Sequence, residues 1–154
     1  MIKVKSKKTY AIVIAALLLV VDLSYVLLSI QAQNFFSMLL LLVLIPCVLF
    51  AVATSGVSSM LFQQAKRVFV AAVSGALFGV LLSFLTSYIM KGHNLASLSA
   101  NTQRIAGANE NLDISNISVN IGFGSILMIG FFTFILIYLM DRFVFKNKEV
   151  EHAF

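Results

Sequence analysis

The sequence predicts an all-α integral membrane protein in which four transmembrane helices form one bundle. Hydrophobic residues make up 60% of the 154 residues and charged residues only 11%, whereas soluble domains carry about 25% charged residues. Four apolar segments are each long enough to cross a hydrocarbon core of about 30 Å. We place the helices at about 10–30, 35–62, 68–90 and 121–140, within a single domain that covers residues 1–154.

The first span, residues 10–30, follows a basic head that carries Lys3, Lys5, Lys7 and Lys8. A basic head before an apolar run is also typical of a secretory signal peptide. This run is longer than the roughly 7–15 residues of a signal-peptide core, and Gln31-Ala32-Gln33 is a poor cleavage site. We therefore expect the first helix to be retained.

The second span, residues 35–62, contains Pro46 and ends in a serine-rich segment. Pro46 should kink the helix, because proline lacks a backbone N–H and its ring clashes with the preceding turn. The helix either runs on through the serine-rich segment, tilted and with its small residues facing the third span, or ends near Thr54 and leaves an amphipathic piece at the surface. We favour the continuous helix, since tilt accommodates an overlong span.

The third span, residues 68–90, has no charge and carries a small residue at every fourth position. This small-residue stripe consists of Ala71, Gly75, Gly79, Ser83 and Ser87. In lipid there is little hydrophobic force between helices, so side chains that allow close backbone approach favour packing. We expect the stripe to pack within one chain, with this helix at the centre of the bundle and a right-handed crossing of about −40°. A homodimer interface is the alternative.

Residues 91–120 form the only sizeable hydrophilic segment and precede the fourth span at 121–140. We expect a long loop, and long loops in compact bundles are usually functional or disordered. Residues 114–119 alternate between apolar and polar side chains, which fits a short strand or a loop. Asn116-Ile117-Ser118 matches a glycosylation acceptor, which matters only in a eukaryotic secretory context.

Basic residues indicate how the chain is oriented in the membrane. Nine of the eleven Lys and Arg residues lie in the N-terminal head, the connection after the second span, or the C-terminal tail. The positive-inside rule therefore predicts cytoplasmic N- and C-termini and an extracytoplasmic 91–120 loop. The net charge of +5 is then explained by topology and anionic lipid headgroups, so we expect the bilayer and no nucleic acid as a partner. Short connections and the lysine-rich head favour a multi-pass protein of a bacterial plasma membrane.

Asp22 is the strongest candidate for a functional residue. It lies near the middle of the first span, where a charged carboxylate costs on the order of 3 kcal/mol. Tyr25 and Ser29 share its helical face and extend it into a narrow polar strip. No Lys, Arg or His lies in the interior of a predicted span, so we expect Asp22 to be protonated or paired with a cation on another protein.

Three interpretations of Asp22 remain open on the sequence alone. The carboxyl could make a structural hydrogen bond to Tyr25, to a serine of the third span or to a backbone carbonyl. It could instead contact another protein, or it could couple transport to a proton or cation.

The other chemistry-bearing residues argue against an enzyme. His93 and His152 lie outside the spans and have no ligand spacing around them. Glu110 and Asp113 do not match a calcium loop, and the single cysteine, Cys47, cannot form an intrachain disulfide. A catalytic set that includes histidine is therefore missing at membrane depth. We expect no catalytic residues, metal site or cofactor.

The second and fourth spans lead into similar stretches, Ala65-Lys66-Arg67-Val68-Phe69-Val70 and Asp141-Arg142-Phe143-Val144-Phe145-Lys146. Each places a basic residue before an aromatic/Val pair, which suggests a two-helix unit used twice, as in many small transporters. The pattern resembles the GtrA-like family, four-span proteins associated with moving lipid-linked sugars. The long 91–120 segment departs from that family, and no functional residue is carried over.

Two functions fit these observations. The first is a non-enzymatic helical subunit or accessory protein of a cell-envelope membrane complex, which assembles with another membrane protein or with itself through the stripe and Asp22. The second is a small oligomeric transporter or lipid-linked-sugar flippase in which Asp22 is the proton- or cation-coupling site. One copy offers few helices to enclose a path, so transport would require a homo-oligomer.

Overall fold

The computed structural model describes residues 2–92, 96–106 and 122–145, and every regular element in these ranges is a helix. Four helices have the length and composition of membrane spans: Lys8–Ala32, Phe35–Leu61, Lys66–Lys91 and Phe123–Phe143. The prediction of an all-α protein with four spans is confirmed at this level. His93, Glu110, Asp113, Asn116-Ile117-Ser118, the 114–119 alternation and His152 lie outside the described residues.

One long α-helix forms all of the third and fourth spans and most of the first span, which ends in a 3₁₀ turn at Ile30–Ala32. These helices are α1, α4 and α6, which run Ile2–Ser29, Gln64–Gly92 and Phe123–Phe143. Each extends beyond the apolar stretch expected from the sequence at one or both ends. Intrahelical hydrogen bonds satisfy the backbone in lipid and in the headgroup region alike, so the helix need not end where the apolar residues end.

The second span is continuous but changes its helical register. It consists of α2 (Phe35–Leu39), a π-helical turn (Leu40–Leu44) and α3 (Ile45–Leu61). The helix therefore runs through the serine-rich segment, as the favoured interpretation predicts, and the alternative end near Thr54 is wrong. Asn34 caps the start of α2, because its side chain accepts a hydrogen bond from the Ser37 N–H at 3.0 Å.

The π-helical turn comes directly before Pro46, the residue at which we expect a kink. Within the turn, the Ile45 N–H donates to the Leu40 carbonyl, five residues back. Pro46 has no N–H to donate and its ring crowds the preceding turn, so a wider turn relieves the clash there.

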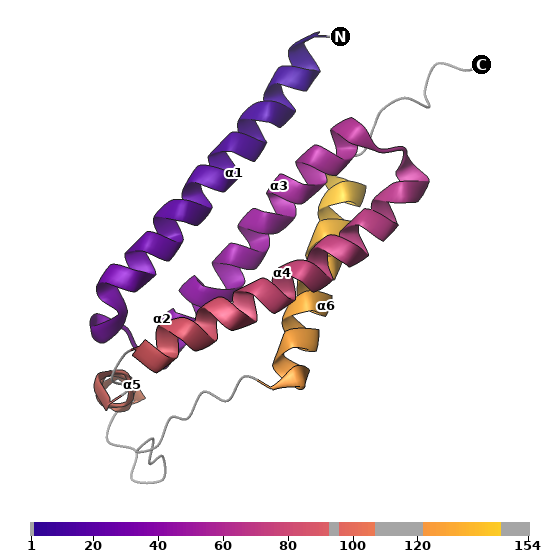
Figure 1. Ribbon diagram of the computed structural model, residues 1–154. Helices are drawn as coiled ribbons and strands as arrows, with labels where there is room; N and C mark the ends of the chain where they lie inside the picture. The colour runs from indigo at the N-terminus through magenta and orange to yellow at the C-terminus, as the bar shows by residue number, and fades with distance from the viewer. Residues whose placement is uncertain (1, 93–95, 107–121, 146–154) are drawn as a thin grey trace, which may run out of the picture.

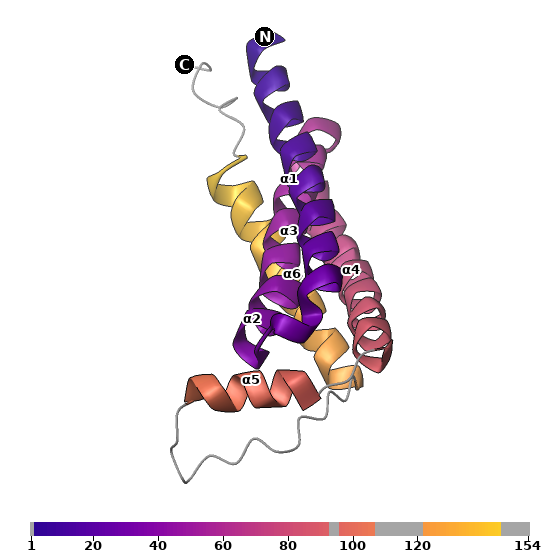
Figure 2. The ribbon, with the colours of Figure 1, turned by 90° about the vertical axis from the view of Figure 1, so that its left-hand side faces the viewer.

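The spans pack in the order α1, α3, α6, α4, and α3 also touches α4 (Figures 1 and 2). The contact between α4 and α6 is the most extensive in the molecule. The expectation that the third span lies at the centre of the bundle is wrong, because α3 and α6 each pack extensively on two neighbours whereas α4 packs mainly on α6. The close approach of α4 and α6 draws α4 to that side and away from α1 (Figure 1).

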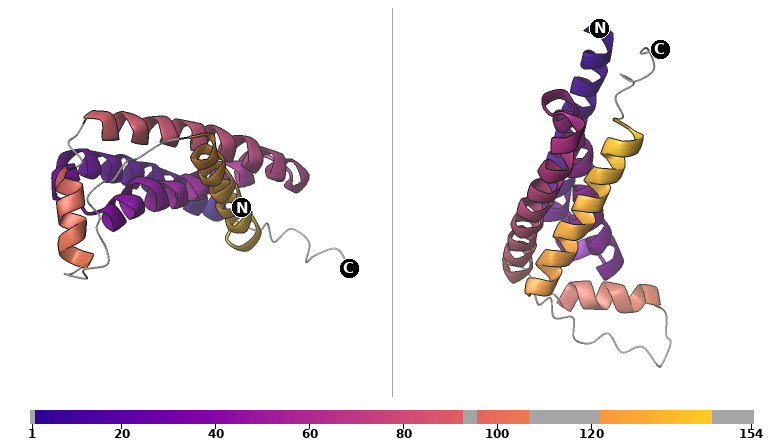
Figure 3. Two further views of the ribbon diagram at one scale, coloured as in Figure 1. Left: turned by 90° about the horizontal axis from the view of Figure 1, so that it is seen from below. Right: turned by 90° about the vertical axis from the view of Figure 1, so that its right-hand side faces the viewer.

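The two ends of the bundle differ. The start of α1, the α3–α4 connection and the end of α6 lie at one end, and α5 (Ala96–Ala106) runs across the other end (Figures 2 and 3). A hydrophobic cluster at the α5 end joins α1, the second span, α4 and α5 through Val26, Ile30, Met38, Leu42, Ile89 and Leu98. The interpretation of residues 91–120 as loop throughout is therefore wrong for 96–106. A short helix forms there because Leu98 and Thr102, four residues apart, can both face the bundle.

Side chains of α5 bond to the turn between α1 and α2. The N–H of Phe35 donates to the Thr102 hydroxyl at 2.9 Å, and the Asn101 amide donates to the carbonyls of Gln31 and Gln33, both at 3.1 Å. These backbone groups lie at helix ends, where no intrahelical partner exists. Thus α5 provides hydrogen-bond partners for the backbone groups of this turn and holds the turn against the bundle.

Replacing Thr102 by valine should loosen this end of the bundle. Thr102→Val keeps the shape but removes the acceptor for the Phe35 N–H, which should lower the free energy of unfolding by about 1–3 kcal/mol. Hydrogen exchange of peptides covering α2 in detergent would then be faster. Thr102→Ser retains the hydroxyl and is the matched control, so equal exchange in the two variants would contradict the role of this bond.

Candidate functional site

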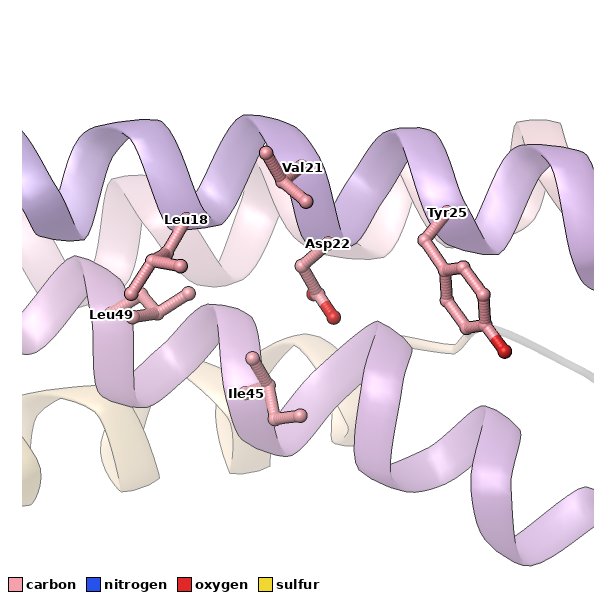
Figure 4. A pocket seen from close by; sticks show the side chains of 6 residues that line it. All are labelled: Leu18, Val21, Asp22, Tyr25, Ile45 and Leu49. Atoms are coloured by element: carbon pink, nitrogen blue, oxygen red, sulfur yellow. The ribbon is translucent and has the colours of Figure 1, made fainter.

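Asp22 points from α1 toward α3, into a groove between the two helices (Figure 4). The groove has a volume of about 300 Å³ and is open at the surface of the bundle. Its lining residues are Leu18, Val21, Asp22, Tyr25, Ile45 and Leu49. Asp22 is thus the one ionisable carboxyl in a groove whose other walls are largely apolar.

The Oδ2 atom of Asp22 is fully buried and has no hydrogen-bond partner in the described part of the chain. Tyr25 lines the same groove, but no hydrogen bond joins the two side chains (Figure 4). The Ser29 hydroxyl donates to the Tyr25 carbonyl at 2.7 Å and accepts from the Gln33 amide at 2.9 Å. The structure therefore brings Asp22 and Tyr25 together, whereas Ser29 is engaged further along α1.

An unpartnered oxygen in this position has an energetic cost. Leaving a buried acceptor unsatisfied costs about 1–3 kcal/mol, and more when the group is charged. None of the structural hydrogen bonds considered for Asp22 is formed among the described residues. A donor from outside this chain would remove that cost, whereas a proton would remove only the part that comes from the charge.

The small-residue stripe of α4 lies against α6. A methyl group on Gly79 would come within 2.8 Å of the Gly130 Cα atom, and one on Gly75 within 3.0 Å of the Gly130 carbonyl oxygen. Ala71 is buried in a cluster with Ile137, which extends the contact toward the end of α6. The backbones of α4 and α6 therefore touch at three glycines, and α6 is the neighbour that the stripe faces.

The two serines of the stripe behave differently. Ser83 is buried, and its hydroxyl has no hydrogen-bond partner among the described residues, whereas Ser87 is partly buried. Neither serine bonds to Asp22.

A polar cluster that the sequence analysis missed joins α1, α3, α4 and α6 near the end opposite α5. We call Lys8, Ser58, Arg67 and Asp141 the end cluster. The Ser58 hydroxyl donates to the Asp141 carboxylate at 3.4 Å, and the positive charges of Arg67 and Lys8 both act on that carboxylate. The other carboxylate oxygen, Asp141 Oδ1, is buried without a hydrogen bond in the described part.

Arg67 also closes the end of α3. Its side chain is only 6% exposed, and its guanidinium donates to the carbonyls of Phe62 at 3.1 Å and Ser59 at 3.3 Å. The last carbonyls of a helix lack intrahelical partners and carry partial negative charge, so a cation there is favourable. The sequence indicated Arg67 as a topology signal and as part of a repeated stretch, but predicted no contact for it. Arg67 and Asp141 carry opposite charges and lie in the two similar stretches that follow the second and fourth spans. This pairing was the signal that could have suggested a contact.

Polar groups also line the contact between α3 and α6. The Ser55 hydroxyl donates to the Ile137 carbonyl at 3.0 Å. The Thr133 hydroxyl donates to the Ile129 carbonyl at 2.7 Å and lies 3.3 Å from the Cys47 sulfur. Ser55 and Ser58 therefore bond to α6, so the expectation that the small residues of this span face the third span is wrong for them.

Metal-ligand residues are scattered in the described ranges. No three His, Cys, Asp or Glu side chains among the described residues come together in a way that could hold a metal ion. Cys47 is a free, buried thiol.

Comparison with known protein families, curated proteins and solved structures gives no match to this chain. The resemblance to the GtrA-like family therefore rests only on the two short stretches that suggested it. The described residues form four helices that are long and apolar enough to cross a membrane, which is consistent with a membrane protein, and a carboxyl-containing groove lies between two of them.

Proposed function

We propose that this protein is a non-enzymatic helical subunit or accessory protein of a cell-envelope membrane complex. It assembles through the groove between α1 and α3, which binds a transmembrane helix of another membrane protein. The observation that carries the proposal is the unpartnered, buried carboxylate oxygen of Asp22 in a groove open to the bundle surface.

The position of α1 supports this assignment. α1 packs extensively only on α3 among the spans, so the groove is bordered by one neighbour and a second helix can lie alongside. Acyl chains offer no hydrogen-bond donor, whereas a partner helix with a basic or hydroxyl side chain at mid-span would satisfy Asp22. A basic partner residue fits best, because it would also neutralise the charge.

We further propose that both termini are cytoplasmic and that the protein belongs to a bacterial plasma membrane. The biased placement of Lys and Arg supports this orientation. In this arrangement the end cluster lies on the cytoplasmic side and α5 on the extracytoplasmic side.

Crosslinking from the groove tests the assignment. A photoreactive residue in place of Tyr25, inside the groove, should join the protein to a partner in native membranes. One in place of Val20, an exposed residue on the opposite face of α1, should give little of that product. Asp22→Leu should weaken the association by about 1–2 kcal/mol, roughly tenfold, which is the size of interhelical polar contacts in membranes. Ser24→Ala, a nearby exposed position, is the matched control and should leave crosslinking unchanged.

A different result would favour transport. If Asp22→Asn leaves crosslinking intact but abolishes a pH-dependent transport signal in liposomes, the accessory function is wrong and Asp22 is a coupling residue. If the Tyr25 product is a homodimer, the partner is a second copy of this chain.

A further inference from the structure

The last turn of α5 carries an apolar side chain on the helical face that is turned toward the bundle. Ile105 follows Leu98 by seven residues and Thr102 by three, so all three share one helical face. Leu98 is 2% exposed within the hydrophobic cluster at the end of the bundle, and Thr102 bonds to the start of α2. The face therefore looks into the membrane region. Ile105 looks the same way, yet it is 59% exposed.

The exposure of Ile105 follows from where α5 ends. The two side views show that this helix projects past the start of the second span on one side (Figures 2 and 3). Among the described residues, no helix lies between the projecting end of α5 and the space beside the spans (Figures 2 and 3). Phe36, on the first turn of α2, is a second exposed apolar side chain at this end of the bundle, at 65%.

Arg104 adds a positive charge beside Ile105. Its side chain is exposed. A helical step of about 100° separates it from Ile105, so it lies at the side of α5, level with the headgroups. A guanidinium binds phosphate through several donors, and a helix with an apolar face and a basic flank is typical of membrane interfaces.

We infer that the C-terminal turn of α5 is a lipid-binding surface, in which Ile105 inserts among acyl chains and Arg104 binds headgroup phosphates of an anionic leaflet. The surface is separate from the Asp22 groove and does not depend on the proposed function. It makes α5 a connection between the bundle and the bilayer surface.

Tryptophan fluorescence in vesicles tests this inference, because the chain contains no tryptophan and any signal comes from the introduced residue. The full chain carrying Ile105→Trp would be reconstituted into phosphatidylcholine vesicles with phosphatidylglycerol. We expect blue-shifted emission, quenching by brominated lipid and protection from aqueous iodide. Ala100→Trp is the matched control, since this exposed residue lies about 140° away around the helix and should face water.

The contribution of Arg104 is measured in the Ile105→Trp background. Arg104→Gln should shift the balance between inserted and lifted α5 by about fivefold in anionic vesicles, the effect of one basic residue near such a surface. It should have little effect in pure phosphatidylcholine vesicles. Inorganic phosphate added to pure phosphatidylcholine vesicles should not increase the insertion of α5. This result would show that Arg104 binds the phosphate of a lipid headgroup and not a free phosphate ion.

Three results would overturn the inference. If α5 rests on lipid, iodide must quench Ile105→Trp less strongly than Ala100→Trp, so equal quenching of the two variants refutes the inference. Protection in native membranes that is lost in lipid vesicles would assign the surface to a protein partner instead. An Ile105→Asn variant that exchanges backbone hydrogens in α5 no faster than the native chain in vesicles would show that insertion contributes nothing.

Discussion

Gly79→Ala should destabilise the protein by about 1–3 kcal/mol, and Gly79→Val by more, because added volume at a tight contact forces the packed elements apart. The added methyl group would lie 2.7 Å from the Gly130 backbone nitrogen and 2.8 Å from its Cα atom. Backbone atoms cannot rotate away as a side chain can, so α4 and α6 must separate along their whole contact. Reversible unfolding in bicelles would measure the loss.

Other glycines supply the controls for this prediction. A methyl group on Gly130 would find its nearest atom at 3.4 Å, an ordinary contact, and one on Gly124 would find nothing within 4 Å. Gly130→Ala should therefore cost little, and Gly124→Ala should be neutral or stabilising because alanine favours helix. Gly75→Ala, with backbone atoms at 3.0 Å, should lie between them and Gly79→Ala. Equal stability of Gly79→Ala and Gly124→Ala would show that α4 and α6 do not touch in the bilayer.

Arg67→Met, in the first turn of α4, should have a larger effect than Gly79→Ala. Methionine keeps most of the length but removes two hydrogen bonds to the end of α3 and one of the positive charges that act on Asp141. Removing one partner of a buried charged pair typically costs about 3–5 kcal/mol, since the other charge stays buried. The same unfolding assay measures this loss.

Two further variants separate charge from packing at this site. Lys66→Met changes an exposed neighbouring cation and should have little effect. The double variant Arg67→Met/Asp141→Leu removes both charges and should recover part of the stability lost in Arg67→Met alone. If the stability loss of the double variant equals the sum of the losses in Arg67→Met and Asp141→Leu, Arg67 acts only on the α3 carbonyls and not on Asp141.

The Asp22 groove and the end cluster hold their carboxylates in different ways. Asp141 lies among a hydroxyl and two cations contributed by three other helices. Asp22 has no such neighbours in the described part of the chain. The surroundings of Asp141 are those of a structural carboxylate, because charges and a hydroxyl within the chain stabilise it. The surroundings of Asp22 are those of a carboxylate that binds a partner outside the chain. This contrast is why we propose function at Asp22 and not at Asp141.

The sequence by itself determined the number of spans and their approximate positions, and it favoured the continuity of the second span through its serines over an end near Thr54. These properties are local, because a helix must satisfy its own backbone in lipid and needs about 20 apolar residues to cross it. It also identified Asp22 and the small-residue stripe, since both are visible in composition and spacing. The register change before Pro46 follows from the same local chemistry.

Only the tertiary structure decided which faces meet. Helices in lipid gain little from hydrophobicity when they associate, so an apolar pattern does not specify a neighbour, and the fit of small residues and polar groups does. The stripe thus pairs with Gly130 and draws α4 to the edge of the bundle, and Arg67 finds the end of α3 and Asp141. The docking of α5 and the absence of a described partner for Asp22 depend equally on that fit, because each is set by residues distant in sequence.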